Sequence, residues 1–175
     1  MLKKFNSTLL IFIFSFVFNQ ISAAENLNIV FVDMDKIIAT SNAGKKIQSS
    51  MDKFAKKENQ KFDTIENKLK KKEQEILKQK NVISKEELDN KIKSFQSELL
   101  KLRNDKIDFN QNIIKMNQSS TNKMVNEINK ILTQYASDNS VSLIIQKKNI
   151  IIGKTELDIT PQILKEFNSK VKSVD

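Results

Sequence analysis

The sequence lacks the side chains on which most enzyme chemistry depends. Its 175 residues include no cysteine, which excludes disulfides and thiol catalysis. They include no histidine, the commonest general base and metal ligand, which excludes a Ser-His-Asp triad and His-rich zinc sites. With no tryptophan and a single tyrosine, a stacking platform for carbohydrates or nucleotides is not expected. We therefore predict that the protein is not an enzyme and needs no cofactor and no metal.

Helix breakers are equally scarce, because the chain has only two glycines and one proline. Gly44 and Gly153 enclose more than a hundred residues that contain neither. Helix interiors exclude proline and disfavour glycine, whereas tight turns need them. Apolar residues recur every three to four positions through most of this stretch, which is typical of one face of a helix. The sequence therefore predicts that most of the chain forms long helices.

The N-terminus has the layout of a secretory signal peptide. Two lysines at positions 3 and 4 precede an apolar run over 9–18, and the small residues Ala23 and Ala24 follow. The run is short for a membrane span, so an uncleaved anchor is the weaker alternative. We predict that 1–24 is removed, with cleavage after Ala23 or Ala24, and that the mature protein lies in the periplasm.

An antiparallel helical hairpin is expected over residues 45–120. Between Leu88 and Met116 the apolar residues alternate in steps of four and three, which predicts a coiled-coil seam. Ser84 and Glu87 have the spacing of a capping box, so a new helix should begin there and the hairpin tip should lie near 81–84. One continuous rod is the alternative. The first arm would be on the order of 55–60 Å long.

The residues on either side of the hairpin, 25–44 and 121–175, predict a small body. Strands are expected at 28–34, 141–147 and 150–152, with Lys148-Asn149 as a hairpin turn between the last two. Thr160 and Pro161 should cap and open a final short helix. The expected fold class is α+β, mostly α. Because three short strands and one helix make a small core without disulfides, we expect oligomerisation to supply the missing stability.

The second hairpin helix changes its apolar register beyond Met116. The pattern continues through Met124, Ile128 and Ile131. We expect the helix to leave the hairpin seam there and to pack on the body.

The chain is basic, with a formal net charge of +9. Residues 41–139 hold 21 basic and 14 acidic residues, so the excess lies on the predicted helices. A basic arm suits an acidic partner such as anionic lipid, lipopolysaccharide, nucleic acid or acidic polypeptide. Nucleic acid is not expected for an exported protein. The alternative is a compositional drift toward lysine without a partner.

One motif permits an enzymatic interpretation. A strand that ends in Asp33-Met34-Asp35 is similar to the first motif of haloacid-dehalogenase-type phosphatases, in which the first carboxylate is the nucleophile. That chemistry needs Mg²⁺ and a parallel sheet built from several later strands, whereas here a coiled coil follows. We expect Asp33 and Asp35 to end the strand and to cap the next turn.

The two ends of the mature chain resemble the Skp/OmpH family of periplasmic chaperones. The segments that carry the resemblance are Ile29-Val30-Phe31-Val32-Asp33-Met34, Ser142-Leu143-Ile144-Ile145 and Asp158-Ile159-Thr160-Pro161-Gln162-Ile163-Leu164, together with the signal peptide and the basic hairpin. The resemblance implies a homotrimer whose strands form a central body and whose hairpins surround a cavity. It also implies that unfolded outer-membrane proteins are held there without ATP. It names no catalytic residues, and it leaves lipid and lipopolysaccharide binding open.

We therefore expect a periplasmic holdase, with a structural adaptor or spacer of an envelope export system as the alternative. Client contacts are expected from apolar and Lys side chains on the arm, which are Phe62, Leu77, Val82, Ile83, Lys70, Lys71, Lys72, Lys78 and Lys80. Ile107 and Ile114 are further apolar residues off the seam. Trimer contacts are expected from the three predicted strands, at Ile29, Phe31, Leu143, Ile145 and Ile151.

Overall fold

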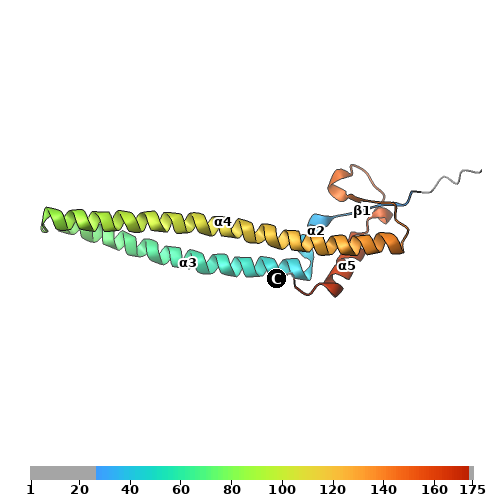
Figure 1. Ribbon diagram of the computed structural model, residues 1–175, viewed down its shortest axis with the longest axis horizontal. Helices are drawn as coiled ribbons and strands as arrows, with labels where there is room; N and C mark the ends of the chain where they lie inside the picture. The colour runs from blue at the N-terminus through green and yellow to red at the C-terminus, as the bar shows by residue number, and fades with distance from the viewer. Residues whose placement is uncertain (1–26, 174–175) are drawn as a thin grey trace, which may run out of the picture.

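The structure is a computed structural model that describes residues 27–173, and the predicted signal peptide lies outside this range. The main elements are β1 (Ile29–Val32), α2 (Met34–Thr40), α3 (Asn42–Gln79), α4 (Lys85–Asp138), β2 (Leu143–Gln146) and α5 (Thr160–Lys170). Short 3-10 helices lie at Lys147–Asn149 (η1) and Thr155–Leu157 (η2). In Figure 1, α3 and α4 form a long hairpin that projects from a small base containing α2, α5 and the strands.

The predicted hairpin is confirmed, and a continuous rod is excluded. The chain reverses between α3 and α4, and Ser84 is the N-cap of α4, where its hydroxyl accepts a hydrogen bond from the Glu87 amide at 3.2 Å. The α3 helix has 38 residues, and at 1.5 Å each it is about 57 Å long. The α4 helix has 54 residues, so it continues past the start of α3 into the base.

The corner between α2 and α3 depends on Ser41 and Gly44. The Ser41 hydroxyl is buried and caps α3 by accepting from the Gly44 amide at 3.1 Å. A Cβ added to Gly44 would lie 1.8 Å from the carbonyl oxygen of Ile38. Only glycine fits this corner, because the end of α2 passes too close for a side chain.

The hairpin is held by a narrow seam. Phe62 and Leu69 of α3 are buried against Leu102 of α4. The ring of Phe109 meets the edge of the Phe62 ring at a centroid distance of 5.6 Å. Such a seam leaves most of each helix exposed to solvent.

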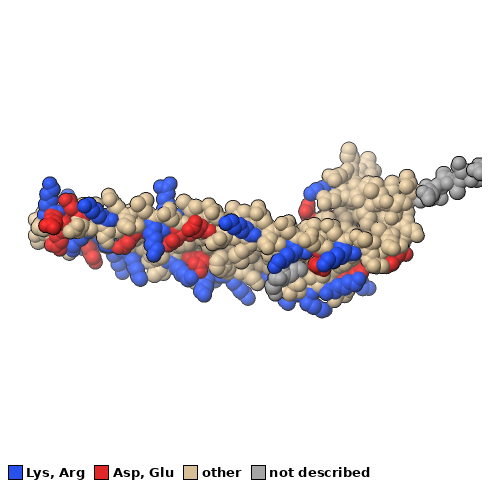
Figure 2. All heavy atoms as spheres, in the orientation of Figure 1, with Lys and Arg blue, Asp and Glu red and all other residues tan. Residues whose placement is uncertain are grey.

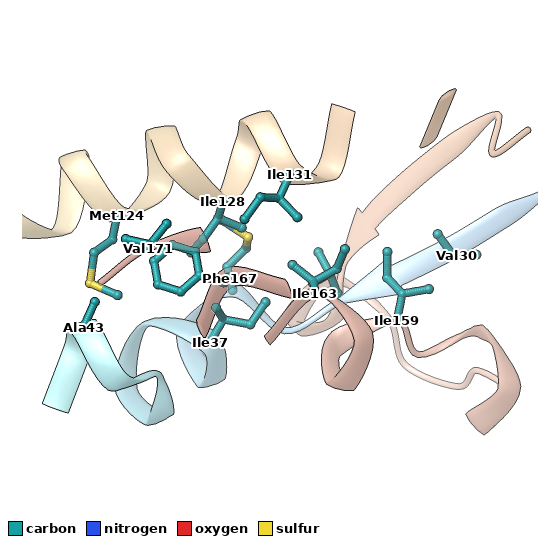
Figure 3. Close-up of a cluster of buried hydrophobic side chains, with 12 residues drawn as sticks. Val30, Ile37, Ala43, Met124, Ile128, Ile131, Ile159, Ile163, Phe167 and Val171 are labelled. Carbon is teal, nitrogen blue, oxygen red and sulfur yellow. The ribbon is translucent and has the colours of Figure 1, made fainter. Parts of the chain in front are cut away.

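The main core lies in the base (Figure 3). Ile37 of α2, Ile128 of α4, and Ile163 and Phe167 of α5 have no exposed surface, and Met124 of α4 is buried beside them. The predicted register change after Met116 is therefore confirmed, since the buried residues of α4 beyond it belong to the core of the base and no longer to the hairpin seam. The base core ties together segments from both ends of the described chain.

The two strands are parallel, with a register that runs from Ile29 opposite Leu143 to Val32 opposite Gln146. The predicted third strand at 150–152 is wrong for this structure. Lys148-Asn149 lies in η1 instead of a hairpin turn. A two-residue hairpin turn favours residues that tolerate positive φ, above all glycine, and neither position is glycine. The chain therefore leaves the sheet after β2.

The start of α5 also differs from the prediction. Pro161 lies in its first turn as expected, but Thr160 does not cap the helix. Its buried hydroxyl instead accepts a hydrogen bond from the Asp33 amide at 2.9 Å. Thr160 thus connects the end of β1 to the start of α5.

Candidate functional surfaces on the arm and the sheet

The positive charge of the arm is concentrated on α3. This helix carries 11 Lys against 6 Asp and Glu, whereas α4 carries 9 Lys and Arg against 8 Asp and Glu. Figure 2 shows Lys and Arg side chains along the lower edge of the arm, over α3. The two helices therefore present different surfaces to a partner.

Several of the predicted arm residues gather near the hairpin tip. Val82 and Leu77 are exposed, and Ile83 is half-buried. Four of the five Lys residues predicted for client contacts are also exposed, in the last third of α3 and just after its end. These are Lys70, Lys71, Lys78 and Lys80. The tip thus combines apolar and cationic side chains on its surface.

Phe62 and Lys72 occupy different positions from those expected. Phe62 is only 7% exposed and lies within the seam, so it cannot offer its ring to a partner while the hairpin is closed. Lys72 forms an ion pair across the hairpin with Glu98 at 2.6 Å and donates to the Ser94 hydroxyl at 3.0 Å. The hydrogen bond from Lys72 holds the pKa of Glu98 below its usual value. Lys72 therefore joins α3 to α4.

A row of apolar residues on α4 was only partly recognised in the sequence. Leu100, Ile107 and Ile114 are exposed and lie seven residues apart, and we call them the α4 row. Ile107 and Ile114 stand out in the sequence as apolar residues off the seam, but Leu100 follows the seam residue Leu99 and is easily assigned to it. The repeat of seven is the signal that links Leu100 to the other two.

Four of the five residues predicted for trimer contacts share one face of the sheet. Alternation along β1 and β2, together with the register, places Ile29, Phe31, Leu143 and Ile145 on the same side. Val30 and Val32 of β1 lie on the other side, in the core of the base. The first face is thus turned away from the core, and Ile29 and Leu143 are exposed on it.

The fifth residue, Ile151, lies outside the sheet in the segment after η1. Ile151 and its neighbour Ile152 are 99% and 91% exposed. Phe31, by contrast, is buried within its own chain. The Lys147 Nζ atom lies 5.8 Å from the centre of its ring, and Gly153 approaches the ring so closely that an added Cβ would lie 3.0 Å from it. Phe31 therefore supports the loop and is not free for contact with another chain.

The loop beside the sheet is fastened by Asp158. Its carboxylate accepts from Lys147 Nζ at 2.8 Å and from the Thr160 amide at 2.9 Å. Partial burial acts to raise the pKa of Asp158, but these hydrogen bonds outweigh it and hold the pKa below its usual value. The same interaction raises the pKa of Lys147.

Within the phosphatase-like motif, the carboxylate of Asp33 has a structural role. This side chain is the N-cap of α2 and accepts from the Lys36 amide at 2.9 Å, as predicted for the structural interpretation. Between residues 27 and 173, no group of three or more acidic side chains is placed to hold a metal ion. In the same range, no helix is long and apolar enough to cross a membrane.

The chain thus belongs to a class of extended proteins in which a long helical hairpin projects from a small base of parallel strands and short helices. The chain belongs to the OmpH-like family, because the family described as outer membrane protein (OmpH-like) matches residues 28–167. The crystal structure of an OmpH-like outer membrane chaperone candidate from Caulobacter crescentus has the same fold, with a TM-score of 0.79 at 12% identity. The match covers 84% of this chain and 87% of that chain. No curated protein matches.

Proposed function

We propose that the protein is a periplasmic holdase chaperone that binds unfolded outer-membrane proteins without ATP. The observation that carries this proposal is the projecting arm, whose surface combines exposed apolar side chains with an excess of lysine. Membership of the OmpH-like family supports it, as does the fold shared with the chaperone candidate from Caulobacter crescentus. The proposal includes export by the predicted signal peptide and a role that is not enzymatic.

Charge and apolar surface would contribute to client binding at different ranges. The lysines of α3 attract chains of acidic net charge and raise the rate of encounter. Exposed residues such as Leu77 and Val82 then offer short-range contacts with apolar segments. Because these side chains are few and lie outside any core, each contact is weak, and a client can dissociate and fold.

We further propose that the protein works as a homo-oligomer, most simply a trimer. Within residues 27–173 the sheet has two strands, and its outer face exposes Ile29 and Leu143. Next to it, Ile151 and Ile152 are almost fully exposed, although apolar side chains at loop tips are costly in water. Association through 25–44 and 121–175 would cover these residues.

The holdase assay is the dilution of a urea-unfolded outer-membrane barrel protein into buffer with and without the mature chain. We expect the mature chain to suppress light scattering for several unrelated barrels. An adaptor or spacer would instead bind one fixed partner and leave aggregation unchanged. Lack of suppression for every barrel tested would reject the proposed chaperone function.

A tip variant tests whether the end of the arm takes part. Val82→Lys combined with Ile83→Lys removes the apolar surface of the tip, and we expect it to weaken client binding about threefold to tenfold. The unfolded barrel is titrated with variant and wild-type chains, and binding is followed by fluorescence of a label on the barrel. Unchanged affinity would remove the tip from the proposed client surface.

A further inference from the structure

The α4 row has no partner within its own hairpin. Leu100, Ile107 and Ile114 are 60%, 46% and 56% exposed, although large apolar residues on a two-helix arm are expected to face the seam. Seven residues amount to nearly two helical turns, so the three side chains lie on one face of α4 at intervals of about 10.5 Å. They form a row about 20 Å long, with one apolar side chain every two helical turns.

The row borders a shallow groove in the middle of the arm. Its volume is about 630 Å³, and its lining includes Leu99, Leu100, Ile107 and Asn110. Lys106 also lines the groove, but it forms an ion pair with Glu66 across the hairpin. The groove is therefore apolar in part, and Arg103 is a further charged residue in its lining.

Most side chains three and four positions from the residues of the α4 row are uncharged. On a helix, the residues three and four positions away lie beside a given side chain. For the row these neighbours are Gln96, Ser97, Arg103, Asn104, Asn110, Gln111, Asn117 and Gln118. Arg103 is the only charged residue among them. Each amide both donates and accepts hydrogen bonds, so an apolar row is bordered by groups that can bind a polypeptide backbone.

These features favour an extended segment over another helix as the occupant. A coiled-coil seam needs two apolar positions in each heptad, and the row supplies one. A stable protein interface uses about 20–30 residues on each side, whereas eight residues line the groove. An interface confined to this groove is therefore too small for a permanent partner helix or a second copy of the chain. An extended segment, in contrast, presents free N–H and C=O groups that the bordering amides can bind.

We infer that the α4 row is the contact site for extended, uncharged, apolar segments of unfolded polypeptide. This inference rests on the proposed holdase function and assigns the short-range contact to a surface distinct from the lysines of α3. The α3 lysines attract the client as a whole, and the α4 row binds its apolar segments. A preference for apolar over charged segments follows, because Arg103 is the only charged residue among the positions three and four residues from the row.

The first test replaces the row without changing the helix. The row variant carries Leu100→Gln, Ile107→Gln and Ile114→Gln. Its matched control carries Lys101→Gln, Asp108→Gln and Lys115→Gln, which alters the exposed residue following each row position. The probe is a urea-unfolded eight-stranded outer-membrane barrel. We expect the row variant to bind it about tenfold more weakly and the control to stay within about threefold of wild type.

The second test does not depend on the folding of a triple variant. A photoreactive phenylalanine analogue in place of Ile107 is compared with the same analogue in place of Asp108. We expect cross-links to the barrel mainly from position 107. Cross-links from position 107 to a second copy of the chain, in place of the barrel, would overturn the inference.

The two tests also separate this inference from the proposed function. If the wild-type chain binds the barrel, while the row variant binds equally well and position 107 gives no cross-link, only the α4 row is rejected. If the wild-type chain fails to bind any barrel, both proposals fall. Circular dichroism and sedimentation of each variant confirm that its helices and assembly match the wild type before affinities are compared.

Discussion

At the scale of single residues, the two glycines are needed because neighbouring atoms leave little room for a Cβ, and not because their backbone conformation is unusual. Neither Gly44 nor Gly153 has a positive φ. Gly44 lets α3 begin directly against the end of α2, while Gly153 lets the loop after η1 lie on the ring of Phe31. Both are packing requirements between segments that a helical pattern does not reveal.

We predict that Gly44→Ala destabilises the protein by about 3 kcal/mol, because the added Cβ would overlap the backbone carbonyl of Ile38 and force the corner apart. Gly153→Ala is the matched control and should cost about 1 kcal/mol or less, because the nearest atom belongs to a phenyl ring that can shift. Urea unfolding of both variants at one protein concentration measures the difference. Equal unfolding midpoints would show that the α2–α3 corner is not tightly packed.

At the scale of elements, the hairpin combines a local start signal with a few long-range connections. The Ser84 cap defines where α4 begins, and it involves residues only three apart. The Lys72–Glu98 ion pair connects the two helices, and Phe62, Leu69 and Leu102 fill the seam between them. The tip should therefore open more easily than the seam, since it has no buried side chain of its own.

Ser84→Ala should destabilise the start of α4 by about 1 kcal/mol, because the Glu87 amide loses its acceptor. Ser97→Ala, in the interior of the same helix, should cause no loss, since alanine favours helix. Hydrogen exchange measured by NMR is the appropriate assay, and the amides at Glu87 and Leu88 should exchange faster only in the first variant. Equal exchange in both variants would mean that the cap contributes nothing to the tip.

The Lys72–Glu98 pair predicts a dependence on pH. The folded-state pKa of Glu98 is lowered, so the pair contributes stability above the unfolded-state pKa of the carboxyl, and this contribution is lost as the pH falls through the folded-state value. We expect Lys72→Gln to raise the NMR titration midpoint of Glu98. Added salt should bring the wild-type midpoint closer to that of the variant. Identical midpoints in the two proteins would show that the pair does not persist in solution.

At the scale of the whole molecule, the buried core and the exposed apolar surface lie in different places. The core of the base joins α2, α4 and α5, and it leaves Ile29 and Leu143 exposed on the outer face of the sheet. The buried residues of the arm lie in its seam alone. One chain therefore exposes two kinds of apolar surface, one proposed for association and the other for clients.

Sedimentation of the mature chain should give a trimer, and Leu143→Asp combined with Ile151→Asp should dissociate it, because each carboxylate would be buried without a partner. The tip variant with Val82→Lys and Ile83→Lys serves as the control and should stay trimeric, since it lies far from the base. A stable wild-type monomer would reject the trimer. Dissociation of the tip variant would show that the arms also hold the assembly together.

Whether the exposure of a residue could be predicted depends on how far apart in the sequence its contacts lie. Val82 and Leu77 are exposed as expected, because the tip of any hairpin has few neighbours. Phe62 is buried in the seam, and this burial could not be predicted because it depends on Phe109, which lies 47 positions later in the chain. The apolar segment 150–152 was expected to form a strand, yet in one chain it has no strand beside it.

The sequence by itself determined the helices, their caps and the hairpin, because periodicity and capping act over three or four residues. It also determined the absence of the common catalytic groups, since that is a matter of composition. Only the tertiary structure decided which apolar residues are covered: Phe31 and Phe62 are buried, and the α4 row is exposed. The physical reason is that burial depends on residues brought together from distant parts of the chain, and these contacts leave no regular pattern in the sequence.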